Sequence, residues 1–275
     1  MSEPLQQLCA DLGARSAQQL SPLEAGQYPA EWEPAVIQIN RLLADMAHGL
    51  RVHQRFMAEA AHELRTPLAA IQLYADIVSI ETDPEIGQLA MRNLQEGVAR
   101  STRLCQQLLA HGRLEARLGQ NAPRTMVDLA DLARQAVLAH DDSAARQGID
   151  LGLLAPASHL LPGDAEALTL LLNNLIGNAL QHAPRDSTVD VRIEARSAKT
   201  RLSVIDHGPG IPESEWPHAF QPFWTLPGGK TGHGLGLAIV HDTVRLHEGE
   251  IRLAQTPGGG LTVHIDLPSP PVPCG

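Results

Sequence analysis

The segment "EAAHELRTPLAAI" (Glu59–Ile71) places a histidine beside a glutamate, with a threonine about one helical turn later. An ordinary imidazole titrates at about pH 6.5, so at neutral pH one ring nitrogen carries a lone pair that can attack a phosphoryl group. Glu63 is placed to hydrogen-bond the other ring nitrogen of His62, which fixes the tautomer and stabilises developing positive charge. We therefore predict that His62 is a nucleophile supported by Glu63.

The segment "LLNNLIGNALQHA" indicates a helix in which Asn174 and Asn178 are four residues apart and so share one face. Neutral amide oxygens suit Mg²⁺, which keeps several waters and binds mainly through phosphate oxygens. A polar stripe on an amphipathic helix has the same pattern. This segment alone leaves both interpretations open.

The segment "VIDHGPGIP" ends a β-rich run at Asp206, which is followed by Gly208 and Gly210. The glycines allow a tight turn and a close approach to a ligand. A carboxylate buried at such a strand end can accept a hydrogen bond from an exocyclic amine, the feature that distinguishes adenine from guanine. Ordinary turns share this pattern, so the motif is weak by itself.

The segment "TGHGLGLAIV" carries glycines that lead directly into an apolar helix; its candidate binding residues are Gly232, Gly234, Leu235 and Gly236. Backbone N–H groups and the positive dipole end at a helix N-terminus attract an anion, here a triphosphate. It is not a Walker A loop, because no Gly-Lys-Ser/Thr follows, and no strand immediately precedes it as a dinucleotide fold requires.

Helices and strands must position these segments. The first predicted helix is long and begins near Trp32. Apolar residues recur there in alternating steps of four and three, which predicts a heptad seam. The predicted seam is Ile39, Leu43, Met46, Leu50, His53, Met57, Ala60, Leu64, Pro67, Ile71, Tyr74 and Val78. Asp83-Pro84 stops this helix and starts a second one that runs to about Leu118. The apolar side of the second helix is predicted to hold Leu94, Val98, Leu104, Cys105 and Leu108.

Two antiparallel helices cannot close a core alone, so we expect two copies of the chain to form a dimeric four-helix bundle. The alternative is a hairpin within one chain that rests on the remaining residues. In the predicted register, His62 lies two residues from both Ala60 and Leu64 and faces solvent. Pro67 removes the N–H bond to the carbonyl of Glu63, so we predict a hinge beside His62.

After "GQNAPR" the pattern changes to alternating helices and strands, which predicts a two-layer α/β sandwich. The helices are expected near residues 128–145, 164–182 and 234–247, and the strands near 149–154, 188–195, 201–206, 250–254 and 261–267. The predicted division is residues 1–52 as a signalling segment, 53–118 as the helical hairpin, 119–124 as linker, 125–268 as the sandwich and 269–275 as a loose tail.

Composition excludes some classes of function. The formal charge of −10 argues against a nucleic-acid partner, because phosphate binding needs clustered Lys and Arg. Cys9, Cys105 and Cys274 show no metal-ligand spacing, which predicts free thiols in a reducing compartment. No apolar stretch is long enough to span a membrane and no leader is present, so we expect the chain itself to be cytoplasmic.

Taken together, the Asn, Asp and Gly segments resemble the ATP-binding domain shared by histidine kinases, DNA gyrase, the heat-shock chaperone of ninety kilodaltons and mismatch-repair ATPases. The resemblance implies Mg²⁺ and ATP as ligands, with Mg²⁺ on Asn174 and Asn178. It also implies a flexible lid, which we place at Pro212–Thr231 with hinge freedom from Pro227-Gly228-Gly229. Relatives often carry a basic residue at the position of Gln181, so Lys230 is a candidate for the missing phosphate contact, or else an ordinary solvated lysine.

With "FMAEAAHELRTPLAAI" upstream, the chain resembles the core of a two-component sensor histidine kinase over about residues 32–268. The resemblance implies a homodimer that phosphorylates His62 from ATP and passes the phosphoryl group to an aspartate of a response regulator. Thr66 matches the position that in relatives orients a water for dephosphorylating the regulator. The first 52 residues are similar to a HAMP module, which normally follows a transmembrane helix and implies a membrane-anchored full-length form or a soluble relative.

Two rivals to the kinase function follow from the same residues. An ATPase machine of the gyrase or chaperone kind would need a transducer domain after the ATP domain, which the sequence does not carry. A catalytically weak or silent dimeric scaffold would bind partners through the helical bundle alone. The intact Asn, Asp and Gly motifs argue against the silent scaffold.

Overall fold

The computed structural model describes residues 20–118, 124–196, 198–226 and 232–269, together with Gln6, Leu8, Ala10 and Gly13. The chain divides into two compact units, Met1–Arg65 and Thr66–Gly275. Almost all of the predicted tail and linker and most of the first short helix therefore lie outside the described residues. No helix among the described residues has the length and apolar character needed to cross a bilayer.

The first unit is built around one long helix. Two short 3₁₀ turns, η1 (Ala25–Gln27) and η2 (Ala30–Trp32), precede helix α2 (Glu33–Ile80), which continues into the second unit. Leu8, Leu23, Tyr28 and Val36 form a small apolar cluster at its start. Asn40 anchors the preceding chain, because its side chain accepts from the N–H of Leu23 at 2.6 Å and donates to the carbonyl of the same residue at 2.8 Å.

The predicted heptad seam is only partly covered by the chain itself. Leu43, Ala60 and Pro67 are buried, whereas Met46 and Met57 are 57% and 54% exposed. His62 is exposed, as its register predicts, and α2 continues through Pro67 without ending. An apolar seam that stays open in a single chain is what a second copy would cover.

Helix α3 (Pro84–Arg117) follows α2 after a short connection and completes the helical hairpin. The Asp83 carboxylate caps its start by accepting from the Glu85 N–H at 2.9 Å, with Pro84 in the first turn. On the predicted apolar side, Leu104 is fully buried, whereas Val98 and Cys105 are exposed in the single chain. His111 and Leu114 are buried instead, because this end of α3 packs on helix α6.

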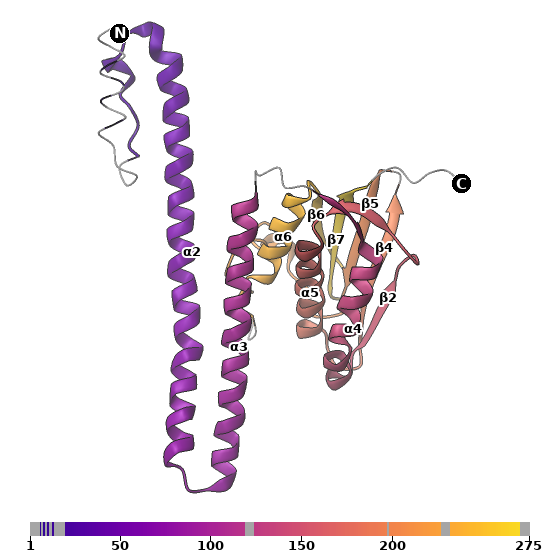
Figure 1. Cartoon of the computed structure of the whole chain (residues 1–275). Helices are drawn as coiled ribbons and strands as arrows, with labels where there is room; N and C mark the ends of the chain where they lie inside the picture. The colour runs from indigo at the N-terminus through magenta and orange to yellow at the C-terminus, as the bar shows by residue number, and fades with distance from the viewer. Residues whose placement is uncertain are drawn as a thin grey trace. The chain divides into compact units, whose positions relative to one another are not determined.

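The predicted α/β sandwich is confirmed. Five strands pair in the order β2-β4-β5-β7-β6, with only β2 and β4 parallel. Figure 1 shows that the helices cover one face of this sheet. The strands are β2 (Asp150–Leu154), β4 (Thr188–Arg196), β5 (Lys199–Ile205), β6 (Glu250–Gln255) and β7 (Leu261–Pro268), and the helices are α4 (Leu129–Gln147), α5 (Ala165–His182) and α6 (Gly236–Leu246).

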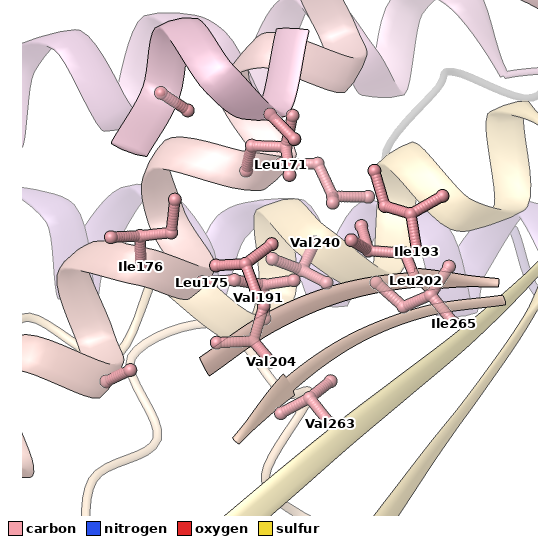
Figure 2. Packing of buried hydrophobic residues seen from close by; sticks show 14 of the residues in the cluster. Leu171, Leu175, Ile176, Val191, Ile193, Leu202, Val204, Val240, Val263 and Ile265 are labelled. Carbon is pink, nitrogen blue, oxygen red and sulfur yellow. The ribbon is translucent and has the colours of Figure 1, made fainter. Parts of the chain in front are cut away.

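The core of the sandwich lies between these helices and the inner face of the sheet. Alternate residues of β4, β5 and β7 point inward, among them Val191, Val204 and Ile265, and meet Leu171 and Ile176 of α5 (Figure 2). The outward residues of the same strands carry paired charges. Burial of this apolar face fixes the register of the strands and therefore the place where each strand ends.

Two short strands were not predicted. β1 (Thr125–Asp128) and β3 (Leu160–Gly163) pair antiparallel beside the start of α4. Each has four residues and no clear alternation, so sequence periodicity gives no signal for them. The Asp128 carboxylate stabilises this region. It accepts hydrogen bonds from the N–H groups of Ala130 and Asp131 at the start of α4, and from the N–H of His159.

A buried histidine connects the end of α6 to the start of α5. His247 follows α6 and is 2% exposed, and its Nε2 accepts the N–H of Asp164, the N-cap of α5, at 2.9 Å. Nδ1 lies 2.8 Å from the Thr243 carbonyl and donates to it. Burial disfavours the imidazolium and so lowers the pKa of His247, although the hydrogen bond to the Thr243 carbonyl acts against this. The neutral ring leaves Nε2 able to accept.

We expect the stability of the chain to fall with pH below about 6.5, in part through His247. The unfolded chain takes up this proton near the ordinary value, whereas the folded chain resists it until a lower pH. The loss therefore develops between the ordinary and the folded pKa, with a slope of at most about 1.4 kcal/mol per pH unit. Urea unfolding of His247→Gln should give a flatter dependence than the original chain. Equal slopes for the two proteins would contradict this assignment, and His48→Gln, which changes an exposed histidine of α2, is the matched control.

Candidate functional site

The Asn, Asp and Gly segments singled out from the sequence come together at one end of the sandwich. A Cβ added to Gly236 would lie 2.7 Å from the Asn178 side-chain nitrogen, and one added to Gly208 would lie 2.6 Å from the His182 carbonyl oxygen. Helix α5 therefore touches both glycine-rich segments. Nothing in the spacing of the sequence required these contacts.

Asp206 lies directly after β5 and is 7% exposed. Its Oδ1 accepts the backbone N–H groups of Gly208 at 2.8 Å and Leu261 at 3.1 Å. Burial raises the pKa of Asp206, and the two backbone hydrogen bonds and nearby His182 and His207 act against that rise. Both of these hydrogen bonds use Oδ1, which leaves Oδ2 to accept from a ligand.

The glycine-rich segment before α6 is shaped by close backbone contacts. Gly234 has a φ of 66°, and a Cβ there would lie 2.4 Å from the Trp224 carbonyl oxygen. Only glycine fits this combination of positive φ and close approach. Helix α6 begins at Gly236, two residues later than the sequence predicts, so Gly232, Gly234 and Leu235 precede its N-terminus. That arrangement leaves the first N–H groups of the helix available to an anion.

The two asparagines on α5 differ in environment. Asn174 is 8% exposed, and its Nδ2 donates to the Leu170 carbonyl at 2.9 Å, which fixes the orientation of the amide. Its Oδ1 accepts from Gln107 Nε2 of α3 at 3.2 Å. Asn178 is half-buried beside Gly236. The described residues hold no cluster of three or more His, Cys, Asp or Glu side chains that could hold a metal by themselves. Amide oxygens with phosphate and water as further ligands fit Mg²⁺ chemistry.

The segment predicted as a lid is anchored over much of its length. Ala219 is buried, and Trp216, Phe220 and Trp224 pack against the core. The Trp216 indole donates to the Ile211 carbonyl at 2.9 Å, and Phe220 stacks on His241 with ring centroids 5.4 Å apart. The predicted lid, which begins at Pro212, is therefore too long, because its described part is packed against the core as far as Trp224. Pro227-Gly228-Gly229 and Lys230 lie outside the described residues.

The histidine segment belongs to α2 and lies partly in each unit. His62 and Thr66 are exposed and Glu63 is half-buried. Their helical spacing places Thr66 about one turn after His62, as the sequence predicts. An exposed imidazole on a helix can reach a ligand that another domain or molecule presents.

Sequence reasoning missed a set of polar contacts between α3 and the sandwich. His111 is 3% exposed, and its Nδ1 lies 2.8 Å from Asp242 Oδ2 on α6. Arg117 pairs with Asp164, and Gln107 contacts Asn174 as described above. The sequence does carry a signal for this contact. Asp242 is a charged residue within an otherwise apolar helix, which indicates a buried polar partner.

Comparisons with known families agree with this geometry. Residues 163–271 match the family described as histidine kinase-, DNA gyrase B- and HSP90-like ATPase. Residues 52–117 match the His Kinase A phospho-acceptor domain, and residues 3–48 match the HAMP domain of sensor proteins similar to PhoQ. The matched ATPase description implies that the sandwich binds ATP.

Individual relatives support the same assignment. The chain is 33% identical to the sensor protein kinase PmrB of Pseudomonas aeruginosa, covering 96% of this chain and 56% of PmrB. It is 34% identical to the sensor protein QseC of Salmonella typhi, covering 94% of this chain and 57% of QseC. The chain thus spans a little over half the length of these relatives. The histidine kinase ThkA, solved in complex with its response regulator TrrA, shares the fold with a TM-score of 0.65 and 21% identity, over 82% of this chain and 64% of that one.

The fold and the three matched domains define a class of protein in which a phospho-acceptor helical hairpin is joined to an ATPase domain. The chain belongs to the family of two-component sensor histidine kinases.

Proposed function

We propose that this chain transfers the γ-phosphoryl group of ATP to His62 and then to an aspartate of a response regulator. The observation that carries the proposal is an exposed histidine in the matched phospho-acceptor segment, on a chain whose Asn, Asp and Gly segments converge at one end of an ATPase fold. His62 is the nucleophile, and Glu63 orients its ring and stabilises the imidazolium character that develops. The silent scaffold is not favoured, because such a protein has no use for an intact nucleotide site.

The proposed nucleotide site uses different groups for base and phosphates. Asp206 accepts the adenine amine, and Gly208 and Gly210 let the backbone come close to the base. The N–H groups around Gly232, Gly234, Leu235 and Gly236 receive the phosphates, and Lys230 is proposed as an additional phosphate contact. The amide oxygens of Asn174 and Asn178 would hold Mg²⁺, which supplies charge neutralisation for the phosphates.

We propose that the chain acts as a homodimer at the cytoplasmic side of a membrane. The open apolar seam of α2 supports a second copy. The greater length of PmrB and QseC supports a longer form, and the HAMP match at residues 3–48 supports membrane anchoring of that form. The proposed division remains 1–52, 53–118, 119–124, 125–268 and 269–275. Thr66 is proposed to orient water when the regulator is dephosphorylated, and the ThkA–TrrA complex supports a regulator as partner.

The proposal is tested by incubating the purified chain with γ-labelled ATP and Mg²⁺. A phosphoramidate is lost in acid and survives alkali, unlike the phosphate esters of serine or threonine. Label with this stability, absent when Mg²⁺ is chelated, is the expected result. Failure of the chain to take up label at all would overturn the proposed activity.

Pro67 is proposed as a hinge, because it removes one backbone hydrogen bond from α2 five residues after His62. We expect Pro67→Ala to straighten and stiffen this part of the helix and to change the ratio of kinase to phosphatase activity several-fold. Nucleotide affinity should stay within about twofold, because Pro67 is not part of the proposed site. A ratio equal to that of the original chain, measured with the cognate regulator, would remove the hinge from the account.

A further inference from the structure

Helix α3 is connected to α5 by long polar side chains. The helix itself packs on α6 (Figure 1). From that position Gln107 Nε2 donates to Asn174 Oδ1 at 3.2 Å, and the Arg117 guanidinium pairs with the Asp164 carboxylate. Asp164 is the N-cap of α5, and Asn174 lies near the middle of that helix. Residues of α3 therefore reach both the start and the middle of the helix that carries the proposed Mg²⁺ ligands.

These two contacts have the same spacing on both helices. Gln107 and Arg117 are ten residues apart on α3, and their partners Asn174 and Asp164 are also ten residues apart along the chain. Ten residues of α-helix span about 15 Å. Because the residue numbers rise on α3 as they fall on α5, the two helices run antiparallel here. One position of α3 therefore satisfies both contacts at once.

The pair of Arg117 with Asp164 holds α3 beside the start of α5. The side chains of this pair are 37% and 18% exposed, whereas those of Arg113 and Glu166, which lie 3.7 Å apart, are 74% and 78% exposed. Well-exposed ion pairs contribute little, because water and salt screen them. We therefore assign the docked position of α3 to Arg117, together with the buried Leu114, rather than to Arg113.

The contact at Asn174 uses the oxygen that the proposed site needs. Asn174 is 8% exposed, and its Nδ2 donates to the Leu170 carbonyl at 2.9 Å, so the amide cannot turn over. Its Oδ1 has a second lone pair, but a cation there would face the positive hydrogen of the Gln107 N–H. A hydrated Mg²⁺ also needs room for its waters. Docking of Gln107 and coordination of a cation thus draw on one oxygen.

We propose that Gln107 competes with Mg²⁺ for Asn174 Oδ1 and so sets the Mg²⁺ concentration at which the site binds nucleotide. The inference rests on the proposed function, because it assigns a regulation to the same site. The contact of Gln107 with Asn174 and the binding of Mg-nucleotide disfavour each other by equal amounts, since coupling between two binding events is reciprocal. Nucleotide without a cation does not need Oδ1, so its binding is independent of Gln107.

The competition is tested by calorimetry of the whole chain with a non-hydrolysable ATP analogue, first in EDTA and then in saturating Mg²⁺. The informative quantity is the factor by which Mg²⁺ lowers the Kd of each protein. We expect this Mg²⁺ factor to be about three- to tenfold larger for Gln107→Ala than for the original chain, the range for removal of one neutral hydrogen bond. In EDTA the two Kd values should agree within about twofold. Alanine is a strong helix former, so the variant keeps α3.

Two further variants separate the competition from a general change in packing. Gln106→Ala changes the neighbouring, exposed glutamine of α3 and should keep the Mg²⁺ factor of the original chain. Arg117→Gln removes the ion pair that holds α3 beside Asp164, so by itself it should raise the Mg²⁺ factor. In a chain that also carries Gln107→Ala it should add nothing, because the oxygen of Asn174 is already free.

The outcomes distinguish this inference from the function on which it rests. Equal Mg²⁺ factors for the original chain and Gln107→Ala overturn the competition, and a smaller factor for the variant would instead make Gln107 a support of the cation. An equal gain from Gln106→Ala, or a gain from Arg117→Gln that persists beside Gln107→Ala, also overturns it. Absence of analogue binding in every protein, with and without Mg²⁺, overturns the proposed nucleotide site itself.

Discussion

The chain with His62→Gln should incorporate label from γ-labelled ATP at no more than about one hundredth of the original rate. Glutamine has no basic nitrogen that can form a phosphoramidate, so the covalent step is lost rather than slowed by misplacement. Binding of Mg-nucleotide should stay unchanged, because His62 is not among the residues that converge at the end of the sandwich. Filter-bound label and calorimetry on the same preparations measure the two quantities.

The matched control is His48→Gln. His48 is exposed on the same helix and, like His62, lies two residues from two members of the predicted seam, but it has no neighbouring glutamate. Its substitution should leave labelling within about twofold. Equal labelling of His62→Gln and the original chain would show that the phosphoryl group is attached elsewhere.

The second large effect is expected at Asp206. Asp206→Asn keeps the size of the side chain and an Oδ1 that can accept from Gly208 and Leu261, but it replaces the free acceptor Oδ2 by an amide donor. The hydrogen bond from the adenine amine to Oδ2 is then lost, and the amide N–H of the variant faces the N–H of the adenine amine. We expect nucleotide affinity to fall about 100-fold, or about 2.7 kcal/mol, a loss typical of a charged hydrogen bond replaced by a mismatch.

Thermal unfolding shows whether this loss is local. The variant should melt close to the original chain, because the backbone hydrogen bonds of Oδ1 are kept. Asp190→Asn, which changes a carboxylate paired with Arg192 on the outer face of the sheet, is the control and should bind nucleotide normally. Retention of full affinity by Asp206→Asn would remove this residue from the proposed base contact.

The sequence predicts most of the framework, because hydrophobic periodicity and turn signals are local. The break at Asp83-Pro84 and the strands β4 and β7 follow from such patterns, and so does the exposed position of His62. The four-residue strands β1 and β3 are too short to produce a period. The apolar side of α3 was assigned from its own pattern, and the tertiary contact with α6 decided that His111, not Cys105, is buried.

The site could be predicted as a set of residues but not as a set of contacts. The composition of each segment identified Asp206 and the glycines, because strand ends and helix starts have recognisable residues. The roles of Gln107 and Asp242 depend on how α3 packs on α6 and on the hydrogen bond from Gln107 to Asn174 of α5. The contacts of Gln107 with Asn174 and of His111 with Asp242 join residues 67 or more positions apart, and no local pattern in the sequence encodes them.

The central claim is that the phosphoryl group is bonded to one nitrogen of one histidine on α2. The most direct test is fragmentation mass spectrometry of the ATP-treated chain, digested and handled at alkaline pH so that a phosphoramidate survives. The account predicts a single Mg²⁺-dependent phosphopeptide that contains residues 59–71, with the added mass on His62. A modified peptide from any other part of the chain, with residues 59–71 unmodified, would contradict it.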